Sequence, residues 1–157
     1  MFPKFITVHA SATKMDQDFD VEDVRRWHTD PKPRGRGWSD IGYHLFIKLD
    51  GTLQLGRPLY RQGAHVGGHN EDNVGICMAG GLDPSGVPAF TFTGDQIETL
   101  VRVLRVFSIA YNIPLENIKG HRDWSPDLDG NGEITADEYM KECPCFDVRE
   151  LVLARLP

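Results

Sequence analysis

The chain has 157 residues, of which 40% are hydrophobic and 25% charged, and its formal net charge is −6. This length and composition predict one globular domain over residues 1–157, with about two-thirds of the unfolded chain's surface buried on folding. They argue against two classes of protein: no apolar run approaches the roughly 20 residues of a membrane-spanning helix, and no basic stripe indicates a nucleic-acid partner.

The N-terminal region predicts a strand followed by a short helix. Its first residues, MFPKFITVHASATK, lack the long apolar core of a signal peptide, so we expect synthesis in a cytoplasm without a signal peptide or a membrane anchor. Residues 5–11 are rich in β-branched side chains and predict a buried strand. Residues 20–28 predict a helix with Asp20 as its N-cap. The apolar side of this helix comprises Val21, Val24 and Trp27.

The middle of the chain predicts β structure. Residues 31–40 are rich in Pro and Gly and indicate a loop. Residues 42–58 predict a hairpin that turns at Asp50-Gly51, because this dipeptide is a strong turn signal. Residues 73–80 predict a second buried strand, in which Cys77 is a small buried hydrophobe.

The C-terminal half predicts two further helices. A capping box formed by Thr93 and Gln96 precedes a helix expected from Gly94 to Tyr111. Residues up to Gly120-His121 indicate a short strand, and Val148 to Leu156 indicate a closing helix. Because strands and helices interleave, we expect an α/β fold with a central mixed β-sheet flanked by helices. The apolar residues at helical spacing in the long helix are Ile97, Leu100, Val101, Leu104 and Ile109.

Residues 127–138, DLDGNGEITADE, fill every required position of the calcium loop of an EF-hand. They hold five acids and no Lys or Arg, so the rest of the chain is almost neutral. Gly132 provides the sharp turn, and Thr135 could bind directly or hold a water. The expected calcium ligands are Asp127, Asp129, Asn131, Glu133 through its carbonyl, and Glu138 through both carboxylate oxygens.

The frame around this loop is incomplete for an EF-hand. Pro126 disfavours a helix running into Asp127, whereas a short helix through Met140 could follow the loop. We expect modest calcium affinity and no calmodulin-like opening, because the chain contains no second loop of this kind. The alternative interpretation is an acidic solvated turn.

The local sequence does not select a set of zinc ligands. A catalytic zinc takes three protein ligands and keeps one open position, and histidine and thiolate are preferred donors. Three cysteines in a chain made in a cytoplasm argue against a disulfide framework. The candidates are His9, His28, His44, His65, His69, His121, Cys143 and Cys145.

Five motifs occur in order along nearly the whole chain: TVHASATK, WSDIGYHLFIKLDGTLQLGRP, GAHVGGHNEDNVGICMAGG, GHRDWSP and CPCFDV. Together they resemble the phage lysozyme-type N-acetylmuramoyl-L-alanine amidases, whose fold the peptidoglycan recognition proteins share. The segment 127–138 is an insertion relative to this pattern. The resemblance therefore implies an amidase-like α/β fold that carries an added calcium-binding loop.

The resemblance also implies which residues hold zinc. The histidine of the first motif is His9, that of the GHR motif is His121, and the cysteine that opens the CPCF motif is Cys143. Cys145 falls on a variable position of the last motif, so we treat it as a bystander that could substitute for Cys143 only in a damaged site.

The resemblance implies two catalytic residues, Tyr43 and Lys141. The lysine ammonium suits the oxyanion of a tetrahedral intermediate, and the tyrosine could orient the attacking water or relay its proton. Without the resemblance, the favoured interpretations are that Tyr43 packs on the sheet and that Lys141 is an ordinary solvated lysine. His44 points to the other face of its strand from Tyr43 and is expected to be structural.

Other side chains near the expected cleft have open roles. His65 and His69 lie in a glycine-rich loop, where His65 could contact substrate. Trp27 and Trp38 either shape a glycan groove or simply pack.

The resemblance implies a monomeric, zinc-dependent phage endolysin. Its substrate would be peptidoglycan, cut between N-acetylmuramic acid and L-alanine, and it would reach the wall from the host bacterial cytoplasm through another factor such as a holin. Two alternatives stay open, a non-catalytic peptidoglycan-binding module and a regulator of another protein, such as a polymerase inhibitor or calcium sensor. Calcium would either clamp Lys141 and Cys143 in place or stabilise only the insertion.

Overall fold

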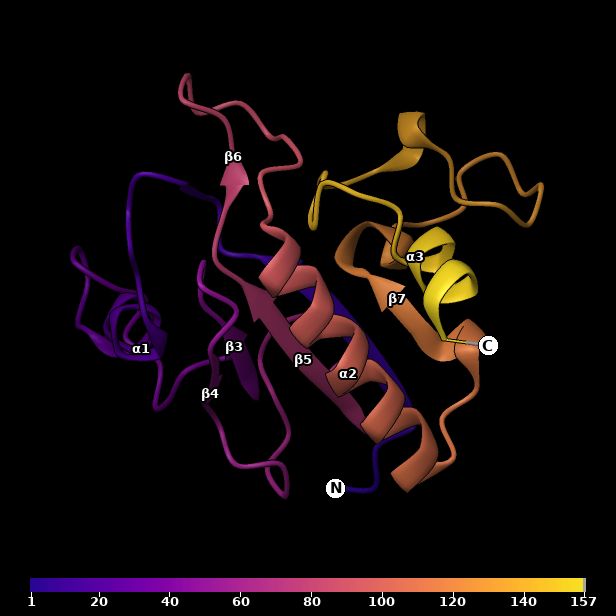
Figure 1. Cartoon of the computed structure of the whole chain (residues 1–157), viewed down its shortest axis with the longest axis horizontal. Coiled ribbons are helices and arrows are strands. Elements are labelled where there is room, and N and C mark those ends of the chain that lie inside the picture. The colour runs from indigo at the N-terminus through magenta and orange to yellow at the C-terminus, as the bar shows by residue number, and fades with distance from the viewer. Residues whose placement is uncertain (157) are drawn as a thin grey trace.

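The computed structural model describes residues 1–156 and shows a central mixed sheet with helices on both faces, which confirms the expected α/β fold (Figure 1). The strand order is β4-β3-β5-β1-β7, in which only the β3–β4 pair is antiparallel. The strands of this sheet are β1 (Phe5–Ala10), β3 (Leu45–Ile47), β4 (Leu53–Leu55), β5 (Asn73–Met78) and β7 (Ile118–Gly120).

A second, two-stranded sheet lies beyond the ends of β1 and β5. It pairs β2 (Thr13–Lys14) with β6 (Gly81–Leu82) in parallel. No sequence pattern predicts this sheet, because each strand is only two residues long and carries no period-2 pattern of its own.

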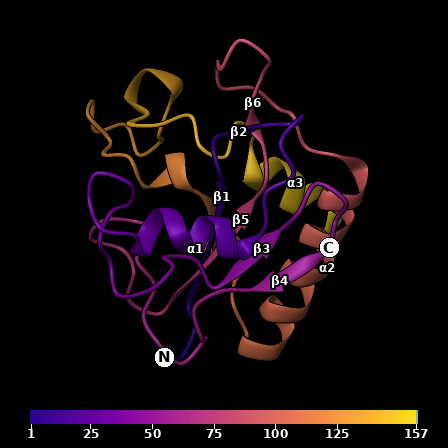
Figure 2. The same cartoon turned by 90° about the vertical axis from the view of Figure 1, so that its left-hand side faces the viewer.

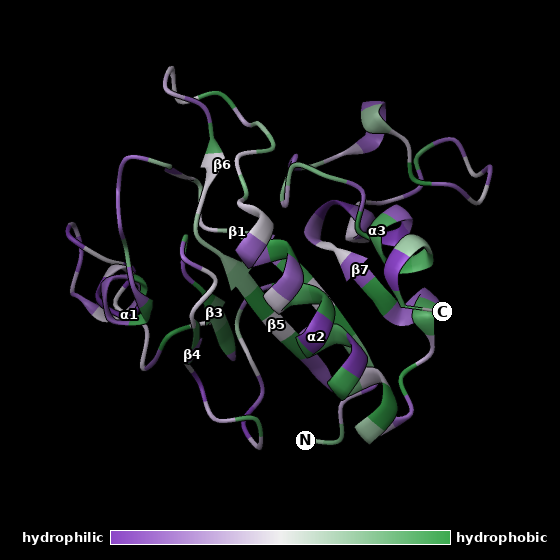
Figure 3. Ribbon diagram, viewed as in Figure 1, coloured by the Kyte–Doolittle hydropathy of each residue, from purple (hydrophilic) through white to green (hydrophobic). Residues whose placement is uncertain are grey.

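Three helices cover the main sheet, and short 3-10 turns connect the remaining segments. The helices are α1 (Val21–Thr29), α2 (Gly94–Tyr111) and α3 (Val148–Arg155), and the turns are η1 (Leu115–Asn117), η2 (His121–Trp124) and η3 (Ala136–Glu138). Figure 3 shows α2 with alternating hydrophobic and hydrophilic residues, as its packing on one face of the sheet requires.

The two faces of the sheet bury different clusters. Ile6 and Val8 of β1 belong to the larger cluster, with Leu100 of α2 and Val148 of α3. The smaller cluster on the other face includes Val24 of α1 and residues of β3 and β5. Figure 2 shows α1 nearest the viewer on that second face. Because side chains alternate along a strand, Thr7 and His9 point to the α1 face.

The helix caps agree with the sequence. Asp20 accepts from the backbone amides of Glu22 and Asp23, and Thr93 and Gln96 form the expected capping box. Val21 and Val24 are buried, and Trp27 is partly buried against their cluster.

One position of the long helix was wrongly assigned to its buried face. Ile109 is 76% exposed, whereas Val103 is buried. Nine residues at about 100° each place Ile109 on the opposite side of the helix from Leu100, which is buried.

Several predicted elements are shorter in the structure. The hairpin turns at Asp50-Gly51, with Gly51 at φ +79°, but each of its strands has only three residues. The strand near residue 120 ends at Gly120, and η3 replaces the helix expected through Met140. Boundaries are the least determined part of such predictions because chain ends fray and caps compete.

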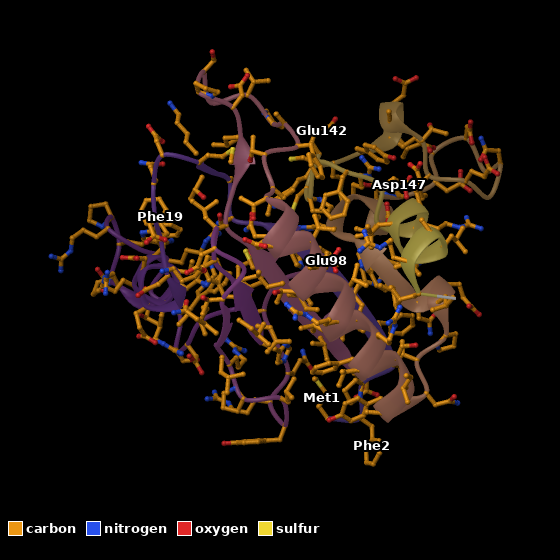
Figure 4. The ribbon with its side chains drawn as sticks, in the orientation of Figure 1. Met1, Phe2, Phe19, Glu98, Glu142 and Asp147 are labelled. Carbon is orange, nitrogen blue, oxygen red and sulfur yellow. The ribbon has the colours of Figure 1, made fainter. Side chains whose placement is uncertain are left out.

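No helix within residues 1–156 combines the length and the apolar character needed to cross a membrane. Phe2 is largely exposed and points away from the body of the molecule near the N-terminus (Figure 4).

Candidate functional site

A cleft of about 500 Å³ opens at the carboxyl ends of the parallel strands, on the α1 face. The end of β1, the loop before the hairpin, the glycine-rich loop after the hairpin and the segment after the insertion all contribute to its walls. Ligands of open α/β sheets bind at this edge because the loops that follow the strands meet there. The lining side chains include His28, Arg36, Trp38, Tyr43, His65, Asn70, His121, Lys141 and Cys143.

Three side chains converge at this cleft: His121 and Cys143 line it, and His9 is buried next to them. His9 Nδ1 lies 3.1 Å from His121 Nδ1 and 3.9 Å from Cys143 Sγ, and donor atoms of all three lie within 4.8 Å of one another. His9 is near the end of β1 and His121 directly follows β7, so the parallel pairing of these strands sets the two histidines side by side. The backbone N–H of Ala10 donates to Cys143 Sγ over 3.2 Å and holds the thiol there.

This donor set fits a zinc ion. Zinc bonds of about 2.0–2.1 Å to nitrogen and 2.3 Å to sulfur separate tetrahedral ligand atoms by roughly 3.3–3.6 Å, close to the two distances above. Burial lowers the pKa of His121 to about 4 and that of His9 well below its usual value, so both rings are neutral and can ligate. Burial raises the pKa of the Cys143 thiol to about 11, so metal binding there must displace a proton.

Cys145 lies outside this group. Its thiol faces the Gly81 carbonyl oxygen at 3.4 Å, on the β6 side of the segment. The structure therefore brings Cys143, and not Cys145, next to the two histidines.

His65 lies directly behind His9. Its Nδ1 is 3.0 Å from His9 Nε2, and its Nε2 is 3.1 Å from the Asn73 carbonyl oxygen. Both ring nitrogens are thus engaged by the protein, so neither is free to bond to a substrate. Burial lowers its pKa to about 3, so the ring is neutral. The sequence signal for this position was weak, because only the fold brings residue 65 next to residue 9.

Tyr43 and Lys141 lie on the walls of the same cleft. The Tyr43 ring is 5.1 Å from the His9 ring between centroids, and Lys141 is exposed where the segment after the insertion passes the opening. Burial raises the pKa of the Tyr43 phenol well above its usual value, and the neighbouring thiols of Cys77 and Cys143 add to this shift. The phenol is therefore a neutral O–H that can donate a hydrogen bond.

The other aromatic and histidine side chains take distinct places. His44 is buried, accepts from the Gly75 N–H through Nδ1 and faces the Arg61 carbonyl oxygen through Nε2. Trp27 of α1 packs edge-on against Phe19, and His69 stacks on Trp124.

Trp38, by contrast, lies at the cleft beneath the Arg36 guanidinium. Sequence reasoning missed the contributions of His28 and Arg36 to this wall. His28 was considered only as a candidate zinc ligand, and the signal for Arg36 was the basic, glycine-rich run RGRGW before the hairpin.

The insertion extends from the same edge of the sheet, beside β7 (Figure 1). Carboxylate oxygens of Asp127, Asp129 and Glu138 lie within 4.8 Å of one another. The Asn131 side chain accepts from the Glu133 N–H over 2.7 Å, and Glu133 itself is exposed. Of the five predicted calcium ligands, three carboxylates therefore converge.

Glu138 joins the two ends of this loop. One carboxylate oxygen accepts from the Leu128 N–H over 2.6 Å and the other from the Thr135 N–H over 2.8 Å. These backbone hydrogen bonds are the main cause of the lowered pKa of the Glu138 carboxyl. The carboxylate therefore already closes the loop on itself.

The stem of the insertion is closed by separate contacts. The Arg122 N–H donates to the Cys143 carbonyl oxygen over 2.8 Å, and the Met140 N–H donates to Ser125 Oγ over 3.0 Å. The stem thus ties the residue after His121 directly to Cys143.

Comparison with known proteins gives a consistent result. A family profile described as N-acetylmuramoyl-L-alanine amidase matches residues 1–145. The endolysin of Enterobacteria phage K11 is 37% identical over 145 residues, covering 92% of this chain and 82% of the relative. The endolysin of Escherichia phage T7 is 33% identical over 144 residues with the same coverage.

Among solved structures, the N-acetylmuramoyl-L-alanine amidase LysC from Clostridium intestinale URNW superposes with a TM-score of 0.71 at 26% identity. The match covers 98% of this chain and 85% of that one. The fold of the two chains is therefore the same.

Gly75→Ala should destabilise the protein by about 1–3 kcal/mol, because overpacking in a closed site costs about that much. A Cβ at Gly75 would lie 2.5 Å from His65 Cδ2. Thermal unfolding monitored by circular dichroism measures the effect. Gly94→Ala is the matched control, because a Cβ there meets nothing within 4 Å, and an unchanged melting temperature in Gly75→Ala would contradict the packing described above.

Proposed function

The chain belongs to the N-acetylmuramoyl-L-alanine amidase family, and from this premise we propose that it is a zinc-dependent phage endolysin. It hydrolyses the amide between the lactyl group of N-acetylmuramic acid and the L-alanine of the stem peptide. The convergence of buried His9 with His121 and Cys143, which line the cleft, carries this proposal. A bound zinc ion supplies a Lewis acid that polarises the scissile carbonyl and acidifies water.

Tyr43 and Lys141 act on the substrate from the walls of the cleft. The Lys141 ammonium offsets the negative charge that develops on the carbonyl oxygen as water adds to the amide carbon. The neutral Tyr43 phenol donates a hydrogen bond in the same cleft and orients the attacking water or relays its proton. The buried surroundings of Tyr43 strengthen such hydrogen bonds, because little water competes for them.

Two other functions fit the same fold less well. A non-catalytic peptidoglycan-binding module would need neither the three converging His and Cys side chains nor a lysine in the same cleft, so their presence supports catalysis. The roles of calcium sensor and of regulator of another protein do not account for the residues of the cleft. The chain acts as one monomeric catalytic domain, made in the host cytoplasm and released to the wall through another factor.

The insertion binds calcium through Asp127, Asp129, Asn131, the Glu133 carbonyl and Glu138. Support comes from the complete EF-hand template and from the three converging carboxylates, which repel one another unless a cation lies between them. Gly132 has φ +88°, a conformation that glycine adopts without strain.

Calcium at this loop acts as a structural clamp on the zinc site. Glu138 is three residues before Lys141 and five before Cys143, so fixing its carboxylate restrains the start of the catalytic segment. The stem contacts of Arg122 and Met140 continue this restraint toward Cys143. The alternative, in which calcium stabilises only the insertion, differs in leaving the activity unchanged.

Digestion of purified peptidoglycan should release peptides with L-alanine at the N-terminus and no new reducing sugar ends. Tyr43→Phe and Lys141→Ala should each lower this activity about 10²–10³-fold, as expected for loss of a proton-transfer or oxyanion partner. Both variants should retain zinc, because neither residue belongs to the donor set.

The matched controls are Tyr60→Phe and Lys4→Ala, which change the same residue types at exposed positions away from the cleft. Their activity should equal that of the parent chain. New reducing ends in the digest, or full activity in both cleft variants, would refute the proposed reaction.

Cys143→Ser should lower the zinc content from about one ion per chain toward zero, whereas Cys145→Ser should leave it unchanged, because thiolate is a far stronger zinc ligand than a hydroxyl. Metal analysis after dialysis measures both. Zinc lost from Cys145→Ser and kept in Cys143→Ser would reverse the ligand assignment.

Calcium at about 100 times its dissociation constant should stabilise the zinc-loaded chain by about 2.7 kcal/mol, which raises the melting temperature by roughly 5–10 °C. Glu138→Gln should abolish this shift. Glu142→Gln, at an exposed position outside the insertion (Figure 4), should keep it.

Removal of calcium with zinc retained should also lower the rate of peptidoglycan cleavage. An unchanged rate with a lowered melting temperature would mean that calcium stabilises only the insertion. No shift in either quantity would mean that the loop is a solvated turn.

A further inference from the structure

The His65 ring is held in a slot between two glycines. A Cβ at Gly63 would lie 2.6 Å from His65 Cδ2, and one at Gly75 would lie 2.5 Å from the same atom. Real Cβ atoms do not approach so closely, so both positions must lack a side chain for the ring to occupy this place. The loop that carries His65 is fixed as well, because Asn70 Oδ1 accepts from the N–H groups of His65 and Val66 over 2.8 and 2.9 Å.

The Asn73 carbonyl oxygen determines which atoms donate in the hydrogen bonds through the His65 ring. The Asn73 carbonyl oxygen can only accept, so His65 Nε2, 3.1 Å away, must carry the ring proton. A neutral imidazole has one N–H, so His65 Nδ1 is an acceptor. His9 Nε2, 3.0 Å from that acceptor, must then be the donor.

Asn73 is itself held in place. Its side-chain N–H donates to the His69 carbonyl oxygen over 2.8 Å, and its side-chain oxygen accepts from Thr7 Oγ1 over 3.0 Å. The Trp124 indole N–H donates to the same Thr7 hydroxyl oxygen over 2.9 Å. The Asn73 carbonyl, which sets the direction of the hydrogen bonds through His65, therefore belongs to a connected polar network on the α1 face of the sheet.

We propose that His65 is a positioning residue that fixes the proton of His9 on Nε2 and so leaves His9 Nδ1 with a free electron pair directed at the metal. The inference rests on the zinc site of the proposed function and adds the residue that orients one of its ligands. Metal-bound histidines generally donate their second N–H to a fixed acceptor, which sets the tautomer and the ring orientation. Here that acceptor is another histidine, whose own tautomer is set by a backbone carbonyl.

Substitutions at residue 65 separate this role from simple packing. Asparagine places its amide oxygen near the position of His65 Nδ1 and so keeps an acceptor for His9. Glutamine extends its amide toward the position of Nε2 and loses that acceptor, although it fills more of the slot. Leucine loses both polar atoms. Positioning therefore predicts that asparagine preserves function better than glutamine, whereas packing predicts the reverse.

Zinc affinity, measured by competition with a chromophoric chelator, is the main readout. We expect His65→Leu and His65→Gln to raise the zinc dissociation constant about 10–100-fold, the range seen when such supporting partners are removed. His65→Asn should retain most of the affinity. His69→Leu is the matched control, because His69 lies in the same loop, is exposed and stacks on Trp124 rather than on a ligand. Circular dichroism establishes that each variant is folded.

Nitrogen-15 NMR of the unsubstituted chain tests the same point without any variant. His9 should show its proton on Nε2 both before and after zinc is added. A proton on His9 Nδ1, an unchanged dissociation constant in His65→Leu, or equal losses in the asparagine and glutamine variants would each overturn the proposal. Failure of the proposed function is distinguishable. A chain that binds zinc as described but releases no peptides from peptidoglycan would still show the expected zinc affinities and the expected proton on His9 Nε2.

Discussion

The site depends on the parallel pairing of β1 with β7. This pairing places His9, near the end of one strand, beside His121, just after the end of the other, although 112 residues separate them in sequence. The same edge receives Cys143 through the stem bond between the Arg122 N–H and the Cys143 carbonyl oxygen. Because β1 and β7 are hydrogen-bonded to each other, the backbone at the two histidines is fixed, and little conformational freedom is left there to lose on binding.

The segment from 125 to 146 carries two kinds of candidate metal ligand, and the backbone keeps them in different surroundings. The carboxylates of Asp127 and Asp129 project from an exposed loop, where hydration suits a hard cation. The Cys143 thiol lies below the cleft opening, partly buried next to two neutral imidazoles, which suits a softer metal. The stem of the insertion thus separates the exposed carboxylate loop from the partly buried thiol by only a few residues.

Much of the fold could be predicted from the sequence because local signals and the global structure agree. The N-cap at Asp20, the capping box at Thr93 and the turn at Asp50-Gly51 are decided by side chains within four residues of one another. The β2–β6 pair and the exposure of Ile109 were missed, since the first depends on tertiary contacts alone and the second on helical phase over nine residues. The position of His65 behind His9 could not be predicted, because it requires the register of β1 against β5 and the absence of side chains at two glycines.

The closed stem below the insertion has a consequence for protein engineering. Arg122 and Ser125 on one arm bond to Cys143 and Met140 on the other, so two hydrogen bonds join the arms without any atom of residues 127–138. Exchange of residues 127–138 for a shorter turn or a peptide tag would therefore keep these two hydrogen bonds and remove only the restraint that Glu138 adds. The chain thus offers a site for loop exchange beside its own cleft.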